Sequence, residues 1–171
     1  MPLARYVKLY KLPAETQTPG LREMKKEDVK AVHTILNKYL SQFKLHIQFT
    51  EDEIAHFFVP REGVIESFVV EDEKNEITDF ISFYSLPSSV LKHPEHKTLN
   101  VAYSYYMVPG KYSAKELMKD ALIAAKNKGY DVFNCLDVQE NKQFLEELQF
   151  GIGDGHLHYY FYNWRVQKLA P

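Results

Sequence analysis

The hydrophobic pattern of this chain changes its period several times, from helical spacing to strand spacing and back. Apolar side chains recur at helical spacing from Lys26 to Phe43. Thr50 and Glu53 then have the spacing of a capping box, which predicts a short second helix that stops at Pro60. Two helices in succession, followed by strand-like segments, restrict the chain to folds in which helices cover a sheet.

The segments after these helices predict the sheet. Val64 to Glu71 and Ile77 to Leu86 are β-branched and aromatic runs joined by a polar turn, which predicts a hairpin. The remaining expected elements are a strand at Asn100 to Val108, a helix capped by Ser113 and ended by Gly129, a strand at Val132 to Leu136, a helix at Asn141 to Leu148, and a last strand at Leu157 to Trp164. With residues 1–24 as an extended, proline-punctuated lead, residues 1–171 predict one α+β domain with a mostly antiparallel central sheet flanked by helices.

Composition limits the class of protein. The 171 residues are 45% hydrophobic, enough to bury a core, and the net charge of −2 gives no field that would attract nucleic acid or an anionic membrane. The single cysteine, Cys135, has no partner for an internal disulfide and lies in an apolar run, so we interpret it as a packing residue. We find no signal peptide and no membrane-spanning segment in this sequence, and we expect a reducing, cytoplasmic location.

A glycine-rich run comes after the last predicted helix. Gly151, Gly153 and Gly155 alternate with other residues, and Asp154 between them offers an acceptor for a cationic or N–H group. The run predicts a binding loop. A purely structural alternative is that Asp154 and Gly155 make a tight turn between a helix and a strand.

This run and several others resemble the carboxyl-terminal half of the eukaryotic N-myristoyltransferases. The other matching segments, in the same order as in that family, are Lys8 to Pro13, Pro19 to Arg22, Asp79 to Ser88, Ala102 to Tyr106, and Asp131 to Asn134. Together they cover nearly the whole chain. The resemblance implies a GNAT-like acyltransferase fold, with this chain as the second of two such units in the enzyme.

The resemblance also implies a substrate site. In the family the glycine-rich loop contacts the amino-terminal glycine of the peptide substrate. By this likeness the expected peptide-binding residues are Asp154, Gly155, Leu157, Ser88, Tyr84 and Tyr103. For Ser88 the alternative is a turn or helix cap, and for the two tyrosines it is a half-buried place in the sheet.

Cofactor binding is not expected in this chain. Myristoyl-CoA is the co-substrate of the family, but the junction from Val108 to Ser113 has one glycine and a proline without an N–H, which make a poor cradle for a CoA pyrophosphate. Nothing in the sequence resembles the family's amino-terminal, acyl-CoA-binding half. It also stops at Pro171 without the hydrophobic tail whose terminal carboxylate is the family's catalytic base. We therefore assign no catalytic residue and expect the isolated chain to be inactive.

The sequence thus predicts the peptide-substrate-binding half of an enzyme that transfers myristate from myristoyl-CoA to the amino-terminal glycine of proteins. Its partners would be such peptides and the missing half, or a second copy of the chain, and no nucleic acid. The alternative is a catalytically inactive GNAT-like module that binds peptide amino termini or a partner protein. His156 and His158, two apart on a predicted strand, could ligate a metal, as could His93 and His96, but no third ligand has matching spacing and we predict no metal site.

Overall fold

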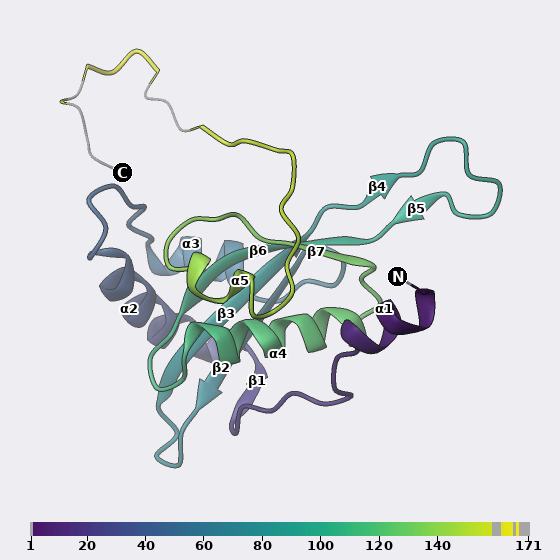
Figure 1. Cartoon of the computed structure of the whole chain (residues 1–171). Helices are drawn as coiled ribbons and strands as arrows, with labels where there is room; N and C mark the ends of the chain where they lie inside the picture. The colour runs from purple at the N-terminus through teal and green to yellow at the C-terminus, as the bar shows by residue number, and fades with distance from the viewer. Residues whose placement is uncertain (1, 159–161, 166, 168–171) are drawn as a thin grey trace.

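The computed structural model describes residues 2–158, 162–165 and 167 and has a five-stranded sheet at its centre (Figure 1). The strand order is β1-β2-β3-β6-β7. Neighbouring strands are antiparallel except for β6 and β7, which run parallel. The strands are β1 (Leu21–Glu23), β2 (Ile65–Glu71), β3 (Ile77–Ser85), β6 (Val101–Val108) and β7 (Val132–Asn134).

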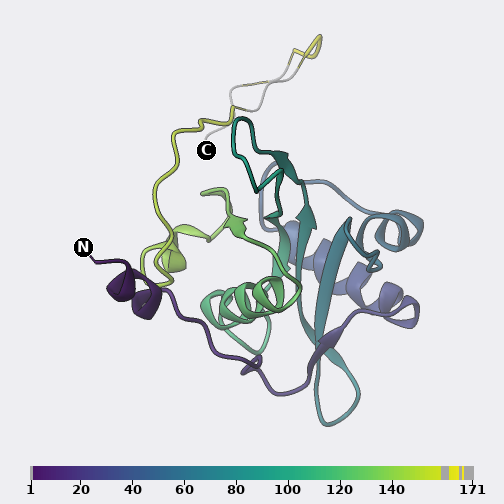
Figure 2. The same cartoon turned by 90° about the vertical axis from the view of Figure 1, so that its right-hand side faces the viewer.

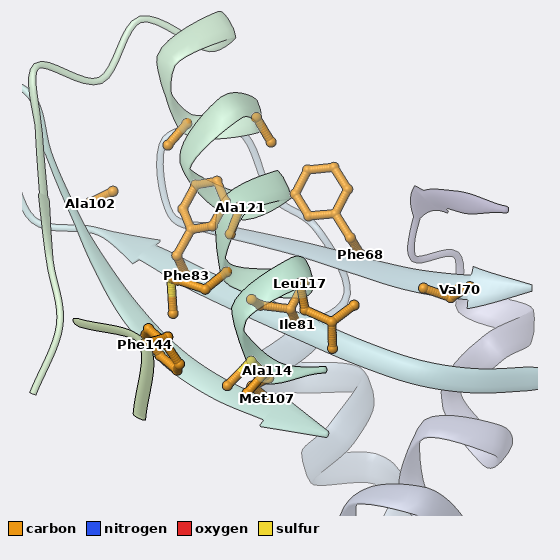
Figure 3. Packing of buried hydrophobic residues seen from close by; sticks show 13 residues of the cluster. Phe68, Val70, Ile81, Phe83, Ala102, Met107, Ala114, Leu117, Ala121 and Phe144 are labelled. Atoms are coloured by element: carbon orange, nitrogen blue, oxygen red, sulfur yellow. The ribbon is translucent and has the colours of Figure 1, made fainter. Parts of the chain in front are cut away.

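Helices cover both faces of this sheet, as Figure 2 shows. One face carries η1 (Lys26–Asp28), α2 (Val29–Leu40) and α3 (Glu51–Phe58), and the apolar side chains of α2 and α3 pack with Val69 and Phe80. The other face carries α4 (Ala114–Asn127), packed on Phe68 and Phe83 (Figure 3). The alternation of Phe68 and Val69 between the two clusters results from the two-residue period of a strand. No helix in the described part of the chain is long and apolar enough to cross a lipid bilayer.

Local signals that the sequence predicts are confirmed. Thr50 accepts a hydrogen bond from the Glu53 amide while the Glu53 carboxylate accepts from the Thr50 amide, the reciprocal capping box that opens α3. Ser113 and Glu116 make the same pair at the start of α4. The chain leaves α4 through Gly129 at φ +82°, which glycine adopts without strain. The hairpin of β2 and β3, the strand β6 and the α+β class also agree with the prediction.

Four predicted elements differ from the structure. The lead is not extended throughout, because residues 3–9 form α1 (Leu3–Leu9) after Pro2, and residues 21–23 form β1. At the other end β7 stops at Asn134, and the helix of the 140s is limited to α5 (Lys142–Leu145). The last strand is wrong for the described residues of that stretch. Residues 157, 158 and 162–164 have no strand structure, while residues 159–161 lie outside the described part.

The loop from Pro87 to Thr98, predicted as an excursion, is a narrow arm. Its strands β4 (Ser88–Ser89) and β5 (Thr98–Leu99) pair with each other and not with the main sheet. The arm leaves β3, projects well past the end of the sheet and returns into β6 (Figure 1). It therefore extends the end of the sheet at which β3 stops and β6 begins.

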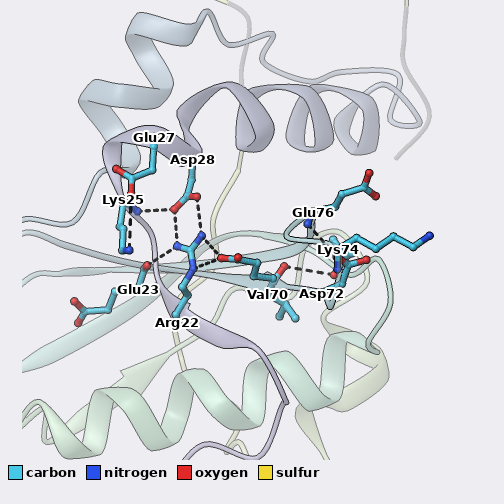
Figure 4. Close-up of polar contacts among 11 residues, drawn as sticks. Arg22, Glu23, Lys25, Glu27, Asp28, Val70, Asp72, Lys74 and Glu76 are labelled. Carbon is cyan, nitrogen blue, oxygen red and sulfur yellow. Dashed lines mark hydrogen bonds and ion pairs between the residues drawn. The ribbon is translucent and has the colours of Figure 1, made fainter.

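A network of charges joins β1 to the elements beside it (Figure 4). The Arg22 guanidinium donates to both carboxylate oxygens of Asp28 at 2.7 and 2.9 Å, and to Glu71 at 2.6 Å. Asp28 is buried, and its hydrogen bond from Arg22 lowers the pKa of the carboxyl. The bidentate geometry fixes the short edge strand to the start of α2 and to the end of β2.

Candidate functional site

Three tyrosines gather where the arm leaves the sheet. Tyr84 on β3 is paired in register with Tyr103 on β6, and their rings stack with centroids 5.4 Å apart. Tyr105, two residues further along β6, presents its ring edge to Tyr84 at 5.6 Å. The structure thus brings together two of the residues that the resemblance implied. Tyr105 was missed, although its spacing of two from Tyr103 already indicated the same face of the strand.

The tyrosine cluster, defined as Tyr84, Tyr103 and Tyr105, packs against α3. Tyr105 stacks on Phe58 of that helix at 5.3 Å, and Phe58 is fully buried. Burial raises the pKa of Tyr105, and Tyr84 adds to the shift. The Tyr105 phenol is neutral at physiological pH, as tyrosines ordinarily are, and its O–H remains a donor. Such a wall offers flat apolar surface with polar edges, which suits an extended peptide.

Ser88 lies at the base of the arm. It is exposed on β4 and pairs with Leu99 of β5. It therefore caps no helix, which removes one of the two structural alternatives. The Leu86 amide donates to the Val101 carbonyl at 2.9 Å and so continues the pairing of β3 with β6. Ser88, two residues later, therefore lies close to the end of the sheet that carries Tyr84.

The glycine-rich segment is open on all sides. It begins at Phe150, whose ring meets Phe133 of β7 at 6.3 Å, and then leaves the core. Gly151, Gly153 and Gly155 are exposed, a Cβ built on any of them would meet no described atom within 4 Å, and none has a left-handed φ. A tight turn and a close internal contact, the two usual structural reasons for glycine, are thus both absent from the described structure of this segment.

Asp154 and Leu157 share this exposure. Leu157 is 58% exposed, and Asp154 makes no hydrogen bond or ion pair within the described residues. The segment starts on the α4 side of the sheet, since Phe150 packs with that cluster, whereas Tyr105 packs with the α2 and α3 side. The structure therefore leaves Asp154 without a polar contact to Tyr84, Tyr103 or Ser88.

The junction before α4 has its amides already in use. The N–H groups of Gly110, Lys111 and Tyr112 donate to the carboxylate of Asp79 at 2.8, 3.1 and 2.9 Å. Gly110 is needed because a Cβ there would lie 2.1 Å from the Thr78 carbonyl oxygen. The sequence predicts that this turn is a poor cradle for a pyrophosphate. The structure shows three donors, all of them satisfied from within.

His93 and Cys135 have structural contacts. The His93 ring nitrogen Nδ1 accepts from the Glu95 and His96 amides at 3.2 and 3.0 Å, which organises the tip of the arm. No group of three metal-ligating side chains occurs among the described residues. Cys135 packs against the α4 cluster, and burial raises the pKa of its thiol to about 11, so the packing interpretation is confirmed.

Comparison with known proteins places this geometry in a family. The model of the myristoyl-CoA:protein N-myristoyltransferase C-terminal domain matches residues 1–171. Glycylpeptide N-tetradecanoyltransferase 2 of Danio rerio is 54% identical over 171 residues, which is 100% of this chain and 35% of the relative. A crystal structure of Saccharomyces cerevisiae N-myristoyltransferase with bound myristoyl-CoA superposes with a TM-score of 0.84 at 38% identity, covering 90% of this chain and 40% of that one.

The fold is shared more widely. An acetyltransferase of Trypanosoma brucei superposes with a TM-score of 0.60 at 16% identity, covering 82% of this chain and 98% of that one. At that identity the likeness concerns the fold alone, and it confirms the predicted GNAT-like architecture. The chain spans 35% of the length of the zebrafish relative and corresponds to one such unit. This chain therefore belongs to the N-myristoyltransferase family, as a carboxyl-terminal domain of that family.

Proposed function

We propose that this chain is the peptide-binding half of an enzyme that transfers myristate from myristoyl-CoA to the amino-terminal glycine of proteins. The glycine-rich segment would receive the first residues of the peptide, and the tyrosine cluster with Ser88 would line the path of the later ones. The cytoplasmic location that the sequence predicts stays part of this proposal.

The observation that carries the proposal is the open surround of Gly151, Gly153 and Gly155. Nothing described in this chain needs a glycine at those positions, since a Cβ would meet no described atom within 4 Å. A ligand or another part of the enzyme that approaches the backbone closely would need all three. Asp154, exposed and without a polar partner among the described residues, supplies a carboxylate for the ammonium or the N–H groups at the start of a peptide.

Acyl-CoA binding and the base would come from other parts of the enzyme. The amides before α4 are satisfied by Asp79, so they offer no free donors to a pyrophosphate. We therefore expect the 171-residue chain, by itself, to bind no myristoyl-CoA and to transfer no myristate.

Exposed apolar residues support a partner for this half. Helix α1 has no buried residue, and Leu3, Val7 and Tyr10 are 78%, 62% and 55% exposed. Three such side chains along one helix of seven residues and its C-cap cost free energy in water unless they are covered. We assign this helix to the contact with the remainder of the enzyme, or with a second copy when the remainder is absent.

Two measurements test the proposal. Calorimetric titration of the 171-residue chain with myristoyl-CoA should be flat, and micromolar binding would refute the division of labour. The chain joined to the remaining parts of the zebrafish relative should transfer myristate to a peptide that begins with glycine and leave its amino-acetylated counterpart unmodified. A folded chimera that binds both myristoyl-CoA and such a peptide but transfers no myristate would instead favour the inactive binding module.

A further inference from the structure

The glycine-rich segment contains an aspartate that is directly followed by a glycine, Asp154 before Gly155. Every other aspartate of the sequence is followed by a residue that has a side chain. An aspartate in front of a glycine can react with its own backbone, because the amide nitrogen of the next residue lies within reach of the side-chain carboxyl. The surroundings of the pair decide whether that reaction proceeds in the folded chain.

The reaction needs water and no other reagent. The Gly155 amide nitrogen attacks Cγ of Asp154 and forms a new N–C bond, while the amide proton and the carboxyl O–H leave together as water. The product is a five-membered succinimide ring. Water then opens the ring at one of its two carbonyl carbons. Opening at the side-chain carbonyl restores aspartate, whereas opening at the backbone carbonyl leaves the main chain running through the former side chain, which is isoaspartate.

A side chain on the attacking residue hinders the ring closure, and a β-branched one hinders it most, because it crowds the amide nitrogen. Gly155 has no side chain, and a Cβ placed there would meet no described atom within 4 Å. Neighbouring groups therefore leave room around the reacting nitrogen. By contrast, Asp137, which is also exposed, is followed by the β-branched Val138.

The ring also closes only if the main chain at Asp154 can rotate until the amide nitrogen faces the carboxyl. Hydrogen bonds of a helix, a strand or a turn oppose this rotation. Asp154 and Gly155 lie outside helices and strands, in the irregular segment that leaves α5 (Figure 2). Within the described structure neither the Asp154 carboxylate nor the Gly155 amide makes a hydrogen bond, and both residues are exposed to water.

Asp72, in the turn between β2 and β3, shows the opposite situation. It is exposed only in part, and its Oδ1 accepts from the amides of Lys74 and Glu76 at 2.8 and 2.9 Å. Its own amide donates to the Glu76 carbonyl at 3.0 Å. The side chain and the backbone of Asp72 are thus both held away from the geometry of ring closure.

We infer that Asp154 and Gly155 form a site of spontaneous isomerisation, at which the folded chain converts residue 154 to isoaspartate. The product lengthens the main chain by one carbon and moves the carboxylate to the former backbone carbonyl carbon. The inference depends on the surroundings of these two residues and not on the peptide-binding role of the segment.

The test incubates the folded 171-residue chain at physiological temperature and pH and follows isoaspartate by peptide mapping, which separates isoaspartyl from aspartyl peptides of equal mass. Isoaspartate should accumulate at residue 154 before any other aspartate. Gly155→Ala should slow it at least about tenfold, which corresponds to about 1.4 kcal/mol in the barrier. Equal accumulation in the wild type and in Gly155→Ala would overturn the inference.

A matched variant separates the effect of the dipeptide from that of its surroundings. Glu73→Gly places a glycine after Asp72, whose side chain and backbone are hydrogen-bonded. In the folded variant, residue 72 should isomerise at least about tenfold more slowly than residue 154. In concentrated urea, where the turn is lost, the two rates should become equal. Equal rates already in the folded variant would show that the open surroundings of Asp154 do not select it.

A functional consequence rests on the proposed function. If Asp154 binds the start of the peptide, incubation of the chain joined to the remaining parts of its zebrafish relative should lower kcat/KM for a glycine peptide in proportion to the isoaspartate fraction. Isomerisation without any loss of peptide use would support the modification site and contradict the peptide-binding role of Asp154. The failure of one proposal is therefore distinguishable from the failure of the other.

Discussion

Gly110 and Gly155 are both glycines in loops, and their surroundings are opposite. A Cβ on Gly110 would lie 2.1 Å from a backbone oxygen of β3, whereas one on Gly155 would meet nothing described within 4 Å. The fold explains why residue 110 is a glycine, but it does not explain why residue 155 is one. The surroundings of a glycine thus distinguish one that the fold requires from one that contact with a ligand or a partner would require.

The largest expected effect is on the crowded side of this comparison. Gly110→Ala forces the turn away from β3 and weakens the amide hydrogen bonds to Asp79. It should cost about 3 kcal/mol of unfolding free energy, or roughly 6 to 12 °C in Tm. Gly153→Ala is the matched change in the open segment and should stay within about 0.5 kcal/mol of the wild type. Equal losses for the two variants in denaturant unfolding would end the distinction.

The ion pair of Arg22 and Asp28 extends the comparison between residues with contacts inside the fold and residues without them. The Asp28 carboxylate takes two hydrogen bonds from Arg22, and Asp28→Asn should cost about 1.5 to 3 kcal/mol at neutral pH. Because the pKa of Asp28 is lowered in the folded state, the ionised pair stabilises the fold above the unfolded pKa of about 3.9. That stabilisation is lost as the pH falls through the lower, folded-state pKa.

Unfolding measured from about pH 7 down to about pH 2 should therefore show a gap between wild type and Asp28→Asn that closes in acid. Asp154→Asn serves as the control, since Asp154 accepts no hydrogen bond from the described residues and its replacement should not alter the acid limb. A gap of constant size across this range would show that Asp28 acts through packing and not through its charge.

A smaller effect distinguishes two serines. Ser113 caps α4 by accepting the Glu116 amide, so Ser113→Ala should cost about 1 kcal/mol. Ser88 is exposed on the arm and caps nothing, so Ser88→Ala should leave the unfolding midpoint unchanged and reduce peptide use only mildly. Loss of stability in Ser88→Ala equal to that in Ser113→Ala would return Ser88 to a structural role.

The sequence predicted those parts of the fold that local chemistry decides. The capping boxes at Thr50 and Ser113 and the glycine stop at Gly129 depend on residues close together in the chain, and all are confirmed. Helix α1 escaped the prediction because residues 1–24 were interpreted as an extended lead from their prolines, although Leu3, Val7 and Tyr10 recur at helical spacing. The last strand, which is wrong for its described residues, was predicted from aromatic composition, and composition alone does not provide a partner strand.

In the candidate site, too, the sequence predicted local features but not contacts between distant residues. The pairing of Tyr84 with Tyr103 agrees with the resemblance, but the role of Asp79 could not be read from the sequence, because its amide partners lie 31 to 33 positions away. No periodicity or motif reports such a contact. The peptide-binding role of Asp154, Gly155 and Leu157 stays a prediction, since the chain by itself provides no ligand for them to touch.

The most direct test of the account measures two quantities on Asp154→Ala and Gly155→Val in the chain joined to the remaining parts of its zebrafish relative. The account predicts an unchanged Tm with kcat/KM for a glycine peptide reduced about 10- to 100-fold, the loss of one charge-assisted hydrogen bond of about 1.5 to 3 kcal/mol, and unaltered binding of myristoyl-CoA. Gly155→Val should do at least as much harm as Asp154→Ala, because its branched side chain blocks a close approach to the backbone. A lowered Tm with unchanged peptide kinetics at a temperature where the variants stay folded would contradict the account.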